Sequence, residues 1–304
     1  MLSVKAIDTK ENELFLGTPL KVTLSCDEDV PADSIELELS DVGLGELKCV
    51  EVSKGGKVIF AGEVDEQTDE LSEFPKTVIV ARSSAAILID NEAYPMSLEH
   101  PSAKDVFRFF AEPFGFRKLC GEDKELDGKL TVAKGTSCFN VLKAFSKDVY
   151  GAFPRCEGDI LYIGGKKTEG RLRLGFDEIP LVSLKVTRLR CNRISEVMVK
   201  LSDNEGYVRK VSNLKAKAEG VAKVRYLNAS SGSSKTLVDA DRMIKESQRN
   251  SFCAVAVCRG CFADALGMEA TVKGIEQEQV VSAVKYTFGK NGEYTRLTLR
   301  RKEF

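Results

Sequence analysis

Tryptophan is absent from this sequence of 304 residues, histidine occurs once, at His100, and neither sign of charge is in excess. A glycosidase needs a pair of carboxylates, and the lack of tryptophan also removes an aromatic side chain that helps to hold a sugar. A serine–histidine or cysteine–histidine mechanism would have to use His100, and no G-x-S-x-G motif accompanies it. With 45 basic and 46 acidic residues, the chain lacks the basic excess of a dedicated nucleic-acid binder.

Long apolar runs are missing as well. No stretch approaches the roughly 18 apolar residues that suggest a membrane span. The N-terminal sequence MLSVKAIDTKENELF lacks the apolar core of a secretory signal. We therefore expect synthesis in a cytoplasm and no membrane partner. Hydrophobic residues make up 43% of the chain and charged residues 30%, which is typical of an ordinary globular protein.

The cysteines are odd in number and mostly isolated in apolar stretches, which predicts buried, reduced thiols. Cys258 and Cys261 have the C-x-x-C spacing of zinc and redox sites. Zinc would need further ligands, and a redox pair would need to open a helix after a parallel strand. Neither condition is met, so we predict no metal ligand and no cofactor. The nine cysteines are Cys26, Cys49, Cys120, Cys138, Cys156, Cys191, Cys253, Cys258 and Cys261.

Acidic residues and glycines give no catalytic motif either. The carboxylates occur in runs such as Asp65-Glu66 and Asp69-Glu70, which normally face solvent. Neither Gly43-Leu44-Gly45 nor Gly164-Gly165 is followed by a lysine-serine pair and a helix in the order of a phosphate-binding loop. We predict no catalytic residue and interpret the protein as a non-enzyme.

The first 95 residues have an almost purely β pattern. Ile35, Leu37 and Leu39 alternate with acidic residues, which indicates a sheet with one buried face and one wet face. The turn Lys54-Gly55-Gly56 predicts a hairpin between 46–52 and 57–64. Because the strands are closely spaced, we expect a first tube-like antiparallel β-barrel domain over residues 1–95.

Residues 96–170 predict an α/β insert. Ser102 and Asp105 have capping-box spacing before an apolar face that ends near Pro113. A short strand over 129–132 precedes a second helix, whose stripe at 139, 142, 145 and 149 is closed by Gly151. A hairpin over 153–163 follows.

The pattern returns to β over residues 171–304, which we interpret as a second β-barrel domain with one helix at about 235–248. Strands are predicted over 194–201 and 207–211, and Asn291-Gly292 predicts the turn of the last hairpin. The predicted fold class is therefore α+β and mainly β, with two tube-like antiparallel β-barrel domains and an α/β insert.

Basic residues at two places in the last domain could line a nucleic-acid path, a channel or an interface. They are Arg188, Arg190 and Arg193 at one place and Arg296, Arg300 and Arg301 at the other. Arg188 and Arg190 are expected to share one strand face, as are Arg296 and Arg300. The wet face of a sheet commonly carries such residues, so a purely solvating role is the alternative.

Three passages together resemble the hub proteins of contractile phage tails, the late-control protein D and prophage tail-hub group related to the hub part of type VI secretion spikes. One is GGKVIFAGEVDEQ with the following KTVIVARSSAAILIDNEAYP. Another is SAKDVFRFFAEPFGF, and the third is KLTVAKGTSCFNVLKAFSKDVYGAFPRCEGDILYIGG. The last part of the third passage also looks like a LysM module. The match is one of order and spacing over most of the chain.

The resemblance implies a homotrimer whose six barrels form a pseudo-sixfold ring and join the tail tube to the spike. It implies as partners a tail tube protein, a spike protein and baseplate wedge proteins, with DNA passing through the channel without specific binding. The location would be the virion tail or baseplate. Because the chain ends at Phe304, directly after the last hairpin, we expect a separate spike protein.

Two other functions remain open at this stage. A cell-wall protein that binds or cleaves peptidoglycan would use the LysM-like stretch 129–165. A hexameric component of the tail tube, or one next to the tape, would have a similar β content.

Overall fold

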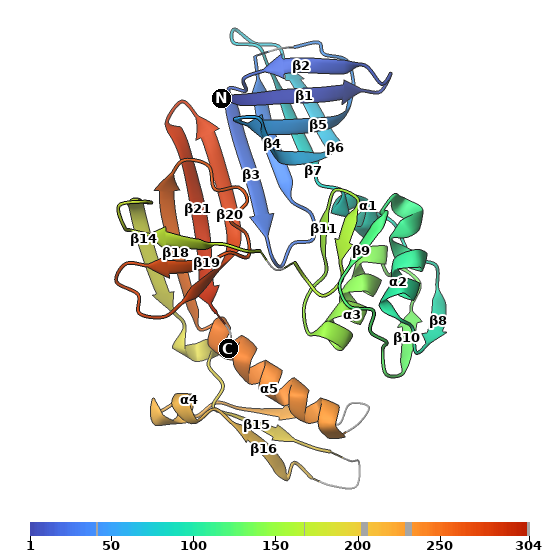
Figure 1. The fold of residues 1–304 in the computed structure, drawn as a ribbon, viewed down its shortest axis with the longest axis vertical. Helices are drawn as coiled ribbons and strands as arrows, with labels where there is room; N and C mark the ends of the chain where they lie inside the picture. Colours follow the sequence, from blue (N-terminus) through green and yellow to red (C-terminus); the bar gives the residue numbers. More distant parts are fainter. Residues whose placement is uncertain (41, 167, 202–205, 229–232, 303–304) are drawn as a thin grey trace. The chain divides into compact units, whose positions relative to one another are not determined.

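The computed structural model describes residues 1–40, 42–166, 168–201, 206–228 and 233–302 (Figure 1). The chain divides into two compact units. The first unit comprises Met1–Glu169, Cys258–Gly267 and Ser282–Leu297, and the second comprises Gly170–Val257, Met268–Val281 and the segment from Thr298. The strands β18 (Phe252–Arg259), β20 (Gln279–Gly289) and β21 (Gly292–Arg301) contribute residues to both units.

The first unit is built on an antiparallel sheet with the order β20-β3-β4-β7-β6-β5-β1-β2. The strand β20 reaches it through the pairing of Ala283–Phe288 with Asp27–Val22, so the last hairpin lies beside the N-terminal strands. The seven N-terminal strands are β1 (Leu2–Asp8), β2 (Glu13–Gly17), β3 (Lys21–Asp27), β4 (Ser34–Leu39), β5 (Leu47–Lys54), β6 (Lys57–Glu70) and β7 (Lys76–Arg82).

The alternation of apolar and polar residues explains why these segments form strands. Ile35, Leu37 and Leu39 are buried on one face of β4, as their spacing predicts. The predicted hairpin is confirmed, because β5 and β6 meet at Gly55 and Gly56, which have φ values of 58° and 83°. Glycine reaches this left-handed region without the steric cost that a Cβ atom imposes.

The prediction of almost pure β structure over the first 95 residues is wrong at α1 (Ala85–Asp90). Ala85, Ala86 and Leu88 are buried at helical spacing. Two adjacent alanines favour a helix, and six residues are too few for a helical period to stand out beside the apolar strand before them.

The predicted insert is an α/β region inside the first unit. The capping box at α2 (Ala103–Phe110) is confirmed: Ser102 Oγ accepts from the Asp105 amide at 3.2 Å, and the Ser102 amide donates to Asp105 Oδ2 at 3.0 Å. The second helix is α3 (Cys138–Tyr150), which Gly151 ends. Short strands accompany the helices: β8 (Met96–Glu99), β9 (Lys118–Cys120), β10 (Lys129–Val132), β11 (Arg155–Glu157) and β12 (Ile160–Tyr162), with a 3-10 turn at Glu112–Phe114.

The insert shares a hydrophobic core with α1. Phe110, Leu142, Phe145 and Leu161 are almost completely buried, and the aliphatic residues of α1 join the same cluster. Burying large apolar side chains of this kind contributes about 1.5–3 kcal/mol each.

The second unit contains a sheet with the order β14-β18-β21-β20, next to which β19 pairs with β20 and β13 with β19. A separate sheet has the order β16-β15-β17. The strands that belong to this unit alone are β13 (Arg171–Leu174), β14 (Leu181–Arg188), β15 (Glu196–Val199), β16 (Arg209–Ser212), β17 (Val224–Leu227) and β19 (Glu269–Val272).

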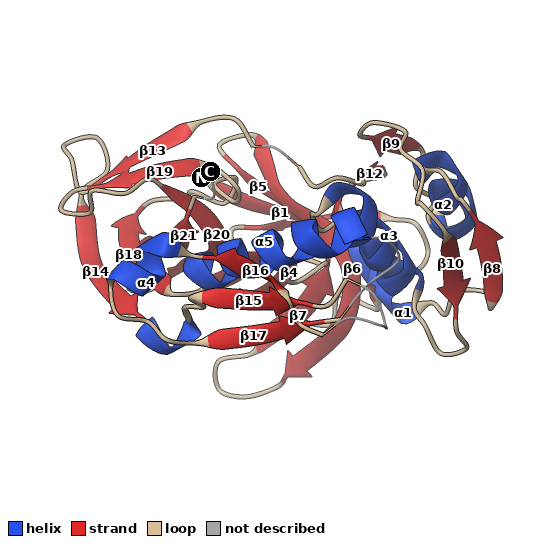
Figure 2. Ribbon diagram, turned by 90° about the horizontal axis from the view of Figure 1, so that it is seen from below, coloured by secondary structure: helices blue, strands red, loops and turns tan. Residues whose placement is uncertain are grey.

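A long helix covers the small sheet of the second unit (Figure 2). Helix α5 (Ser233–Arg249) buries Ala240 and Ile244 against Val197 and Val199 of β15, and it confirms the helix predicted at about 235–248. It is not the only helix of this region, because α4 (Leu214–Ala218) and a 3-10 turn at Arg190–Asn192 are also present. Both are too short to give a hydrophobic period.

The fold class, α+β and mainly β, is confirmed. Among the described strands the pairings follow an open path, and no sheet closes on itself, so the two barrels stay a prediction. Within the described residues, no helix is long and apolar enough to cross a membrane.

Candidate interaction surface

The predicted arginines occupy two strands and a turn. Arg296 and Arg300 lie on the same face of β21, whose other face buries Leu297 and Leu299, so this part of the prediction is confirmed. Arg188, Arg190 and Arg300 belong to the second unit, and Arg296 belongs to the first.

The prediction that Arg188 and Arg190 share a strand face is wrong. β14 ends at Arg188, and Arg190 opens the 3-10 turn that follows. There Arg190 Nη2 donates to the carbonyl of Glu219 at 2.6 Å, which satisfies a backbone group at the end of α4. Arg190 therefore stabilises a loop in this chain.

Arg188 instead lies near Arg301, and so does Arg193; all three are among the basic residues named from the sequence. Burial, together with the charges of Arg193 and Arg188, lowers the pKa of Arg301 below its ordinary value. The Arg301 guanidinium lies over the Phe252 ring, 5.6 Å from its centroid. These arginines are spread along the sequence, so only the pairing of β14, β18 and β21 brings them together.

Two edge strands carry exposed apolar side chains. β2 and β14 are the terminal strands of the described path. β14 exposes Val182 (54% exposed) and Leu184 (37%), and β2 exposes Phe15, over which Lys5 Nζ lies 5.1 Å from the ring centroid. An edge strand presents unpaired backbone donors and acceptors, so it can accept a strand from another chain.

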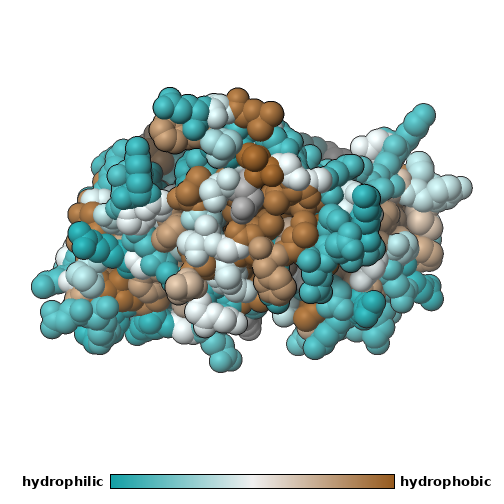
Figure 3. Space-filling model, turned by 90° about the horizontal axis from the view of Figure 1, so that it is seen from above, coloured by the Kyte–Doolittle hydropathy of each residue, from teal (hydrophilic) through white to brown (hydrophobic). Residues whose placement is uncertain are grey.

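A second exposed apolar feature is the tip of the β6–β7 hairpin. Leu71 is 83% exposed and Phe74 is 80% exposed. A space-filling view shows one face of the molecule on which apolar side chains gather among hydrophilic ones (Figure 3). Exposed apolar groups that cluster mark contact sites more often than isolated ones do.

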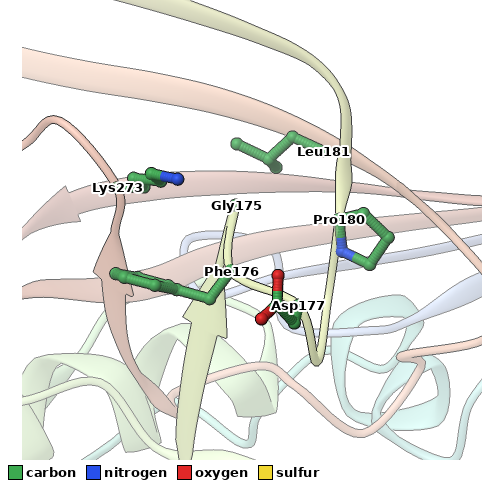
Figure 4. A pocket seen from close by; sticks show the side chains of 6 residues that line it. All are labelled: Gly175, Phe176, Asp177, Pro180, Leu181 and Lys273. Atoms are coloured by element: carbon green, nitrogen blue, oxygen red, sulfur yellow. The ribbon is translucent and has the colours of Figure 1, made fainter.

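A hollow of about 570 Å³ lies beside the turn that follows β13 (Figure 4). The Gly175 amide donates to the Ile179 carbonyl at 2.8 Å, and Arg173 lies over the Phe176 ring at 4.8 Å. Asp177 is the one carboxylate among the described residues of its lining. Its lining consists of Gly175, Phe176, Asp177, Pro180, Leu181 and Lys273.

His100 has a structural place in the first unit. It follows β8 with a φ of 46°, its amide donates to the Gly128 carbonyl at 2.8 Å, and its Nδ1 accepts from the Gly128 amide at 3.3 Å. These bonds close the end of the β8–β10 pair. The His100 ring therefore has a structural role in this turn.

The cysteines are all free thiols, as predicted. Burial raises the pKa of Cys258 to about 11, which suppresses the reactive thiolate. The prediction of burial is confirmed for Cys26, Cys138, Cys156 and Cys258. It is wrong for Cys191, which is exposed in the 3-10 turn after β14, and Cys49, Cys120, Cys253 and Cys261 are only half-buried. In the part of the chain that the structure describes, no three histidine, cysteine or acidic residues lie together as a metal site.

The acidic runs face solvent, as predicted, and they form ion pairs. Asp65, Glu66, Asp69 and Glu70 are all exposed along β6. Arg82 bridges Asp65 at 2.6 Å and Asp90 at 2.7 Å, which joins β6, β7 and α1.

Comparisons with known proteins depend on the fold, since no protein-family model and no curated protein matches the sequence. A tail protein from Neisseria meningitidis MC58 superposes with a TM-score of 0.79 at 16% identity, over 99% of this chain and 97% of that one. The 43 kDa tail protein of prophage MuSo2 from Shewanella oneidensis gives a TM-score of 0.80 at 13% identity, over 99% and 98%. This chain has the fold of phage tail proteins.

The similarity extends to a secretion system. An E. coli protein described as a component of the type VI secretion system, with structural similarity to T4 bacteriophage tail proteins, gives a TM-score of 0.60. Its identity is 10%, and the match covers 100% of this chain and 77% of that one. The resemblance to the tail and baseplate hub group, first suggested by the order of three sequence passages, is therefore confirmed at the level of fold.

Proposed function

We propose that this protein is the structural hub of a contractile phage-type tail or baseplate, where a homotrimer joins the tail tube to the spike. The observation that carries this proposal is the likeness to two phage tail proteins over nearly the whole length of both chains. A match to a shared small domain would not extend from end to end. The role would be structural and non-enzymatic.

The sheet edges support an assembly of several copies. A homotrimer with cyclic symmetry uses two different patches of each chain, one against each neighbour. β2 and β14 offer two such edges, and the apolar Phe15, Val182 and Leu184 on them would be covered in the ring. Under this proposal, strands from neighbouring copies complete the tube-like domains at about 1–95 and 171–304, with the insert 96–170 outside them.

The proposed partners are a tail tube protein on one side of the ring and a spike protein and baseplate wedge proteins on the other. We assign Arg188, Arg190, Arg296 and Arg300 to the channel lining or to an interface. DNA would pass the ring without sequence-specific contacts, which suits a chain with nearly balanced charge. The protein would be made in the bacterial cytoplasm and end in the virion tail or baseplate.

Electron microscopy of tail particles from a strain that carries this gene tests the proposal. We expect the chain at the junction of tube and spike with threefold symmetry. A sixfold ring would identify a tube component instead, and purified particles that lack the chain would contradict the proposal. Loss of turbidity in a cell-wall suspension treated with the purified protein would favour the cell-wall function.

A further inference from the structure

Basic side chains gather in a groove of the second unit. The groove has a volume of about 590 Å³ and lies between α4, the last turn of α5, the loop 276–278 and the end of β21. This volume is in the range of sites that bind ligands. Its lining consists of Arg193, Asn213, Lys215, Ala216, Lys245, Gln248, Arg249, Glu276, Gln277, Glu278, Arg301 and Lys302.

Some of these cations are already neutralised. Arg193 pairs with Glu219, Lys245 with Asp241 at 3.1 Å, and Lys302 with Glu269 at 2.5 Å. These pairs fix the walls of the groove and use much of the available charge. Cations outside these pairs would bind a ligand.

Lys215 and Arg301 have no carboxylate partner among the residues that the structure describes. Lys215 is exposed on α4, whereas Arg301 is half-buried. The Nε of Arg301 is buried and makes no hydrogen bond within the described chain, although a guanidinium is a strong donor. A buried donor without an acceptor is costly, so an arriving acceptor would be bound favourably.

Repulsion between neighbouring positive charges makes the binding of an anion more favourable. Arg188 and Arg193 lie close enough to Arg301 to disfavour its charged form. An anion between guanidinium groups removes the repulsion and accepts charge-assisted hydrogen bonds from them. The groove therefore favours a negatively charged ligand.

We propose that this groove binds the carboxylates of an acidic, extended segment of a partner protein. Lys215 and Arg301 hold the carboxylates, and the aliphatic stems of the arginines and lysines cover the apolar parts of the segment. The amide side chains of Gln248 and Gln277 line the same groove, and an amide can both donate to and accept from a peptide backbone.

Glu276 distinguishes a peptide from a nucleic acid. It is an exposed carboxylate in the lining, and Glu278 lies two residues further on. A carboxylate can accept a hydrogen bond from a peptide N–H, whereas it repels a phosphodiester, which offers no donor along its backbone. The mixture of unpaired cations and an acid thus suits a polypeptide. The proposal does not depend on the trimer.

Fluorescence anisotropy with the full chain tests this inference at low salt, about 20 mM, where surface charges are least screened. The probe is a fluorescein-labelled octapeptide of alternating glutamate and glycine. We expect saturable binding that Lys215→Gln weakens several-fold and Arg301→Gln weakens roughly tenfold, as loss of a charge-assisted bond predicts. Lys215→Gln changes an exposed side chain, so its result stands even if the Arg301 variant folds poorly.

Lys185→Gln is the matched control, because Lys185 is an exposed cation of β14 outside the groove. Equal weakening by this control, or no binding of the peptide up to about 1 mM, overturns the proposal. Tighter binding of labelled dodecathymidine with the same dependence on Lys215 overturns it in favour of a nucleic acid. A change in self-association of Lys215→Gln, measured by sedimentation velocity without probe, overturns it in favour of a second copy.

Discussion

Lys54 and Glu293 form an ion pair of 2.5 Å although they lie 239 positions apart in the sequence. Tyr286 donates a second hydrogen bond to the same Glu293 oxygen at 2.7 Å. The hairpin β5–β6 and the last hairpin, β20–β21, are thereby joined within the first unit. Segments from both ends of the sequence therefore contact each other in this unit.

Glu293→Gln should destabilise the protein by about 1–3 kcal/mol, because it removes a half-buried charge that holds two hydrogen bonds. Burial opposes ionisation, but the bonds from Lys54 and Tyr286 outweigh it and lower the pKa of Glu293 below its ordinary value of 4.5. The stabilisation is therefore present above pH 4.5 and lost as the pH falls through the lower pKa of the folded state. Urea unfolding at pH 7 and pH 3 measures the difference.

The control for this prediction is a double-mutant cycle with Lys54→Met. We expect the two single changes to cost more in sum than the double change does, because they break the same ion pair. Additive costs at pH 7 would contradict the proposed role of the pair.

The pair Asp33–Arg155 joins the loop before β4 to β11 of the insert and is largely buried, with side-chain exposures of 18% and 15%. Among the described residues, Asp33 Oδ1 and Arg155 Nη1 have no hydrogen-bond partner. Arg155→Met alone should lower the free energy of unfolding by about 3–5 kcal/mol, because it leaves the buried Asp33 carboxylate without its cationic partner.

The double change Asp33→Leu and Arg155→Met should recover most of the stability lost by Arg155→Met, because the uncompensated charge is gone. Thermal and urea unfolding of the three proteins compare them. A double variant that is less stable than either single variant would show that the pair itself, and not the stranded charge, supplies the stability.

Elements with local signals could be predicted, and contacts between distant elements could not. Ser102, Gly151 and Asn291 mark a cap, a helix end and a turn within a few residues, and all three features are present. The pairing of β20 with β3 leaves no such mark, because the register of distant strands is set by the packing of the whole sheet.

The arginines near the groove of the second unit show the same limit of prediction from sequence. Arg188 and Arg190 were expected to share a strand face, yet Arg188 lies near Arg301, which the pairing of distant strands brings close. A sequence pattern records which residues share a strand face. It does not record which strands are adjacent.

Gly62→Ala should destabilise the first unit by about 1–3 kcal/mol, the usual cost of overpacking. A Cβ atom at Gly62 would lie 2.2 Å from the Arg82 carbonyl oxygen and 2.8 Å from the Phe60 ring, so β6 and β7 would have to separate. Gly206→Ala is the matched control, because a Cβ atom there meets no atom of the described residues within 4 Å. Equal stability of the two variants in urea would contradict the close approach of β6 and β7.

Cysteine alkylation tests the burial pattern of both units. Cys191 is exposed, whereas Cys26, Cys138, Cys156 and Cys258 are buried. At pH 8, iodoacetamide should modify Cys191 at least on the order of tenfold faster than these four, since buried thiols are shielded and their raised pKa values suppress the thiolate. Mass spectrometry of timed digests gives the rates, and Cys191→Ser should remove this rapidly modified site. Fast labelling of Cys258 would show that the end of β18 is open.

Val182→Lys combined with Leu184→Lys tests the use of β14 as an assembly edge. Both side chains are exposed in the isolated chain, so the unfolding free energy should change by less than about 0.5 kcal/mol. Charged residues on an edge strand block pairing with another chain, so assembly of the proposed hub ring in tail particles should fail. The control is Val208→Lys, an exposed valine of the second unit that lies outside β2 and β14. If electron microscopy finds normal particles with the double variant, β14 does not form a subunit contact of the proposed ring.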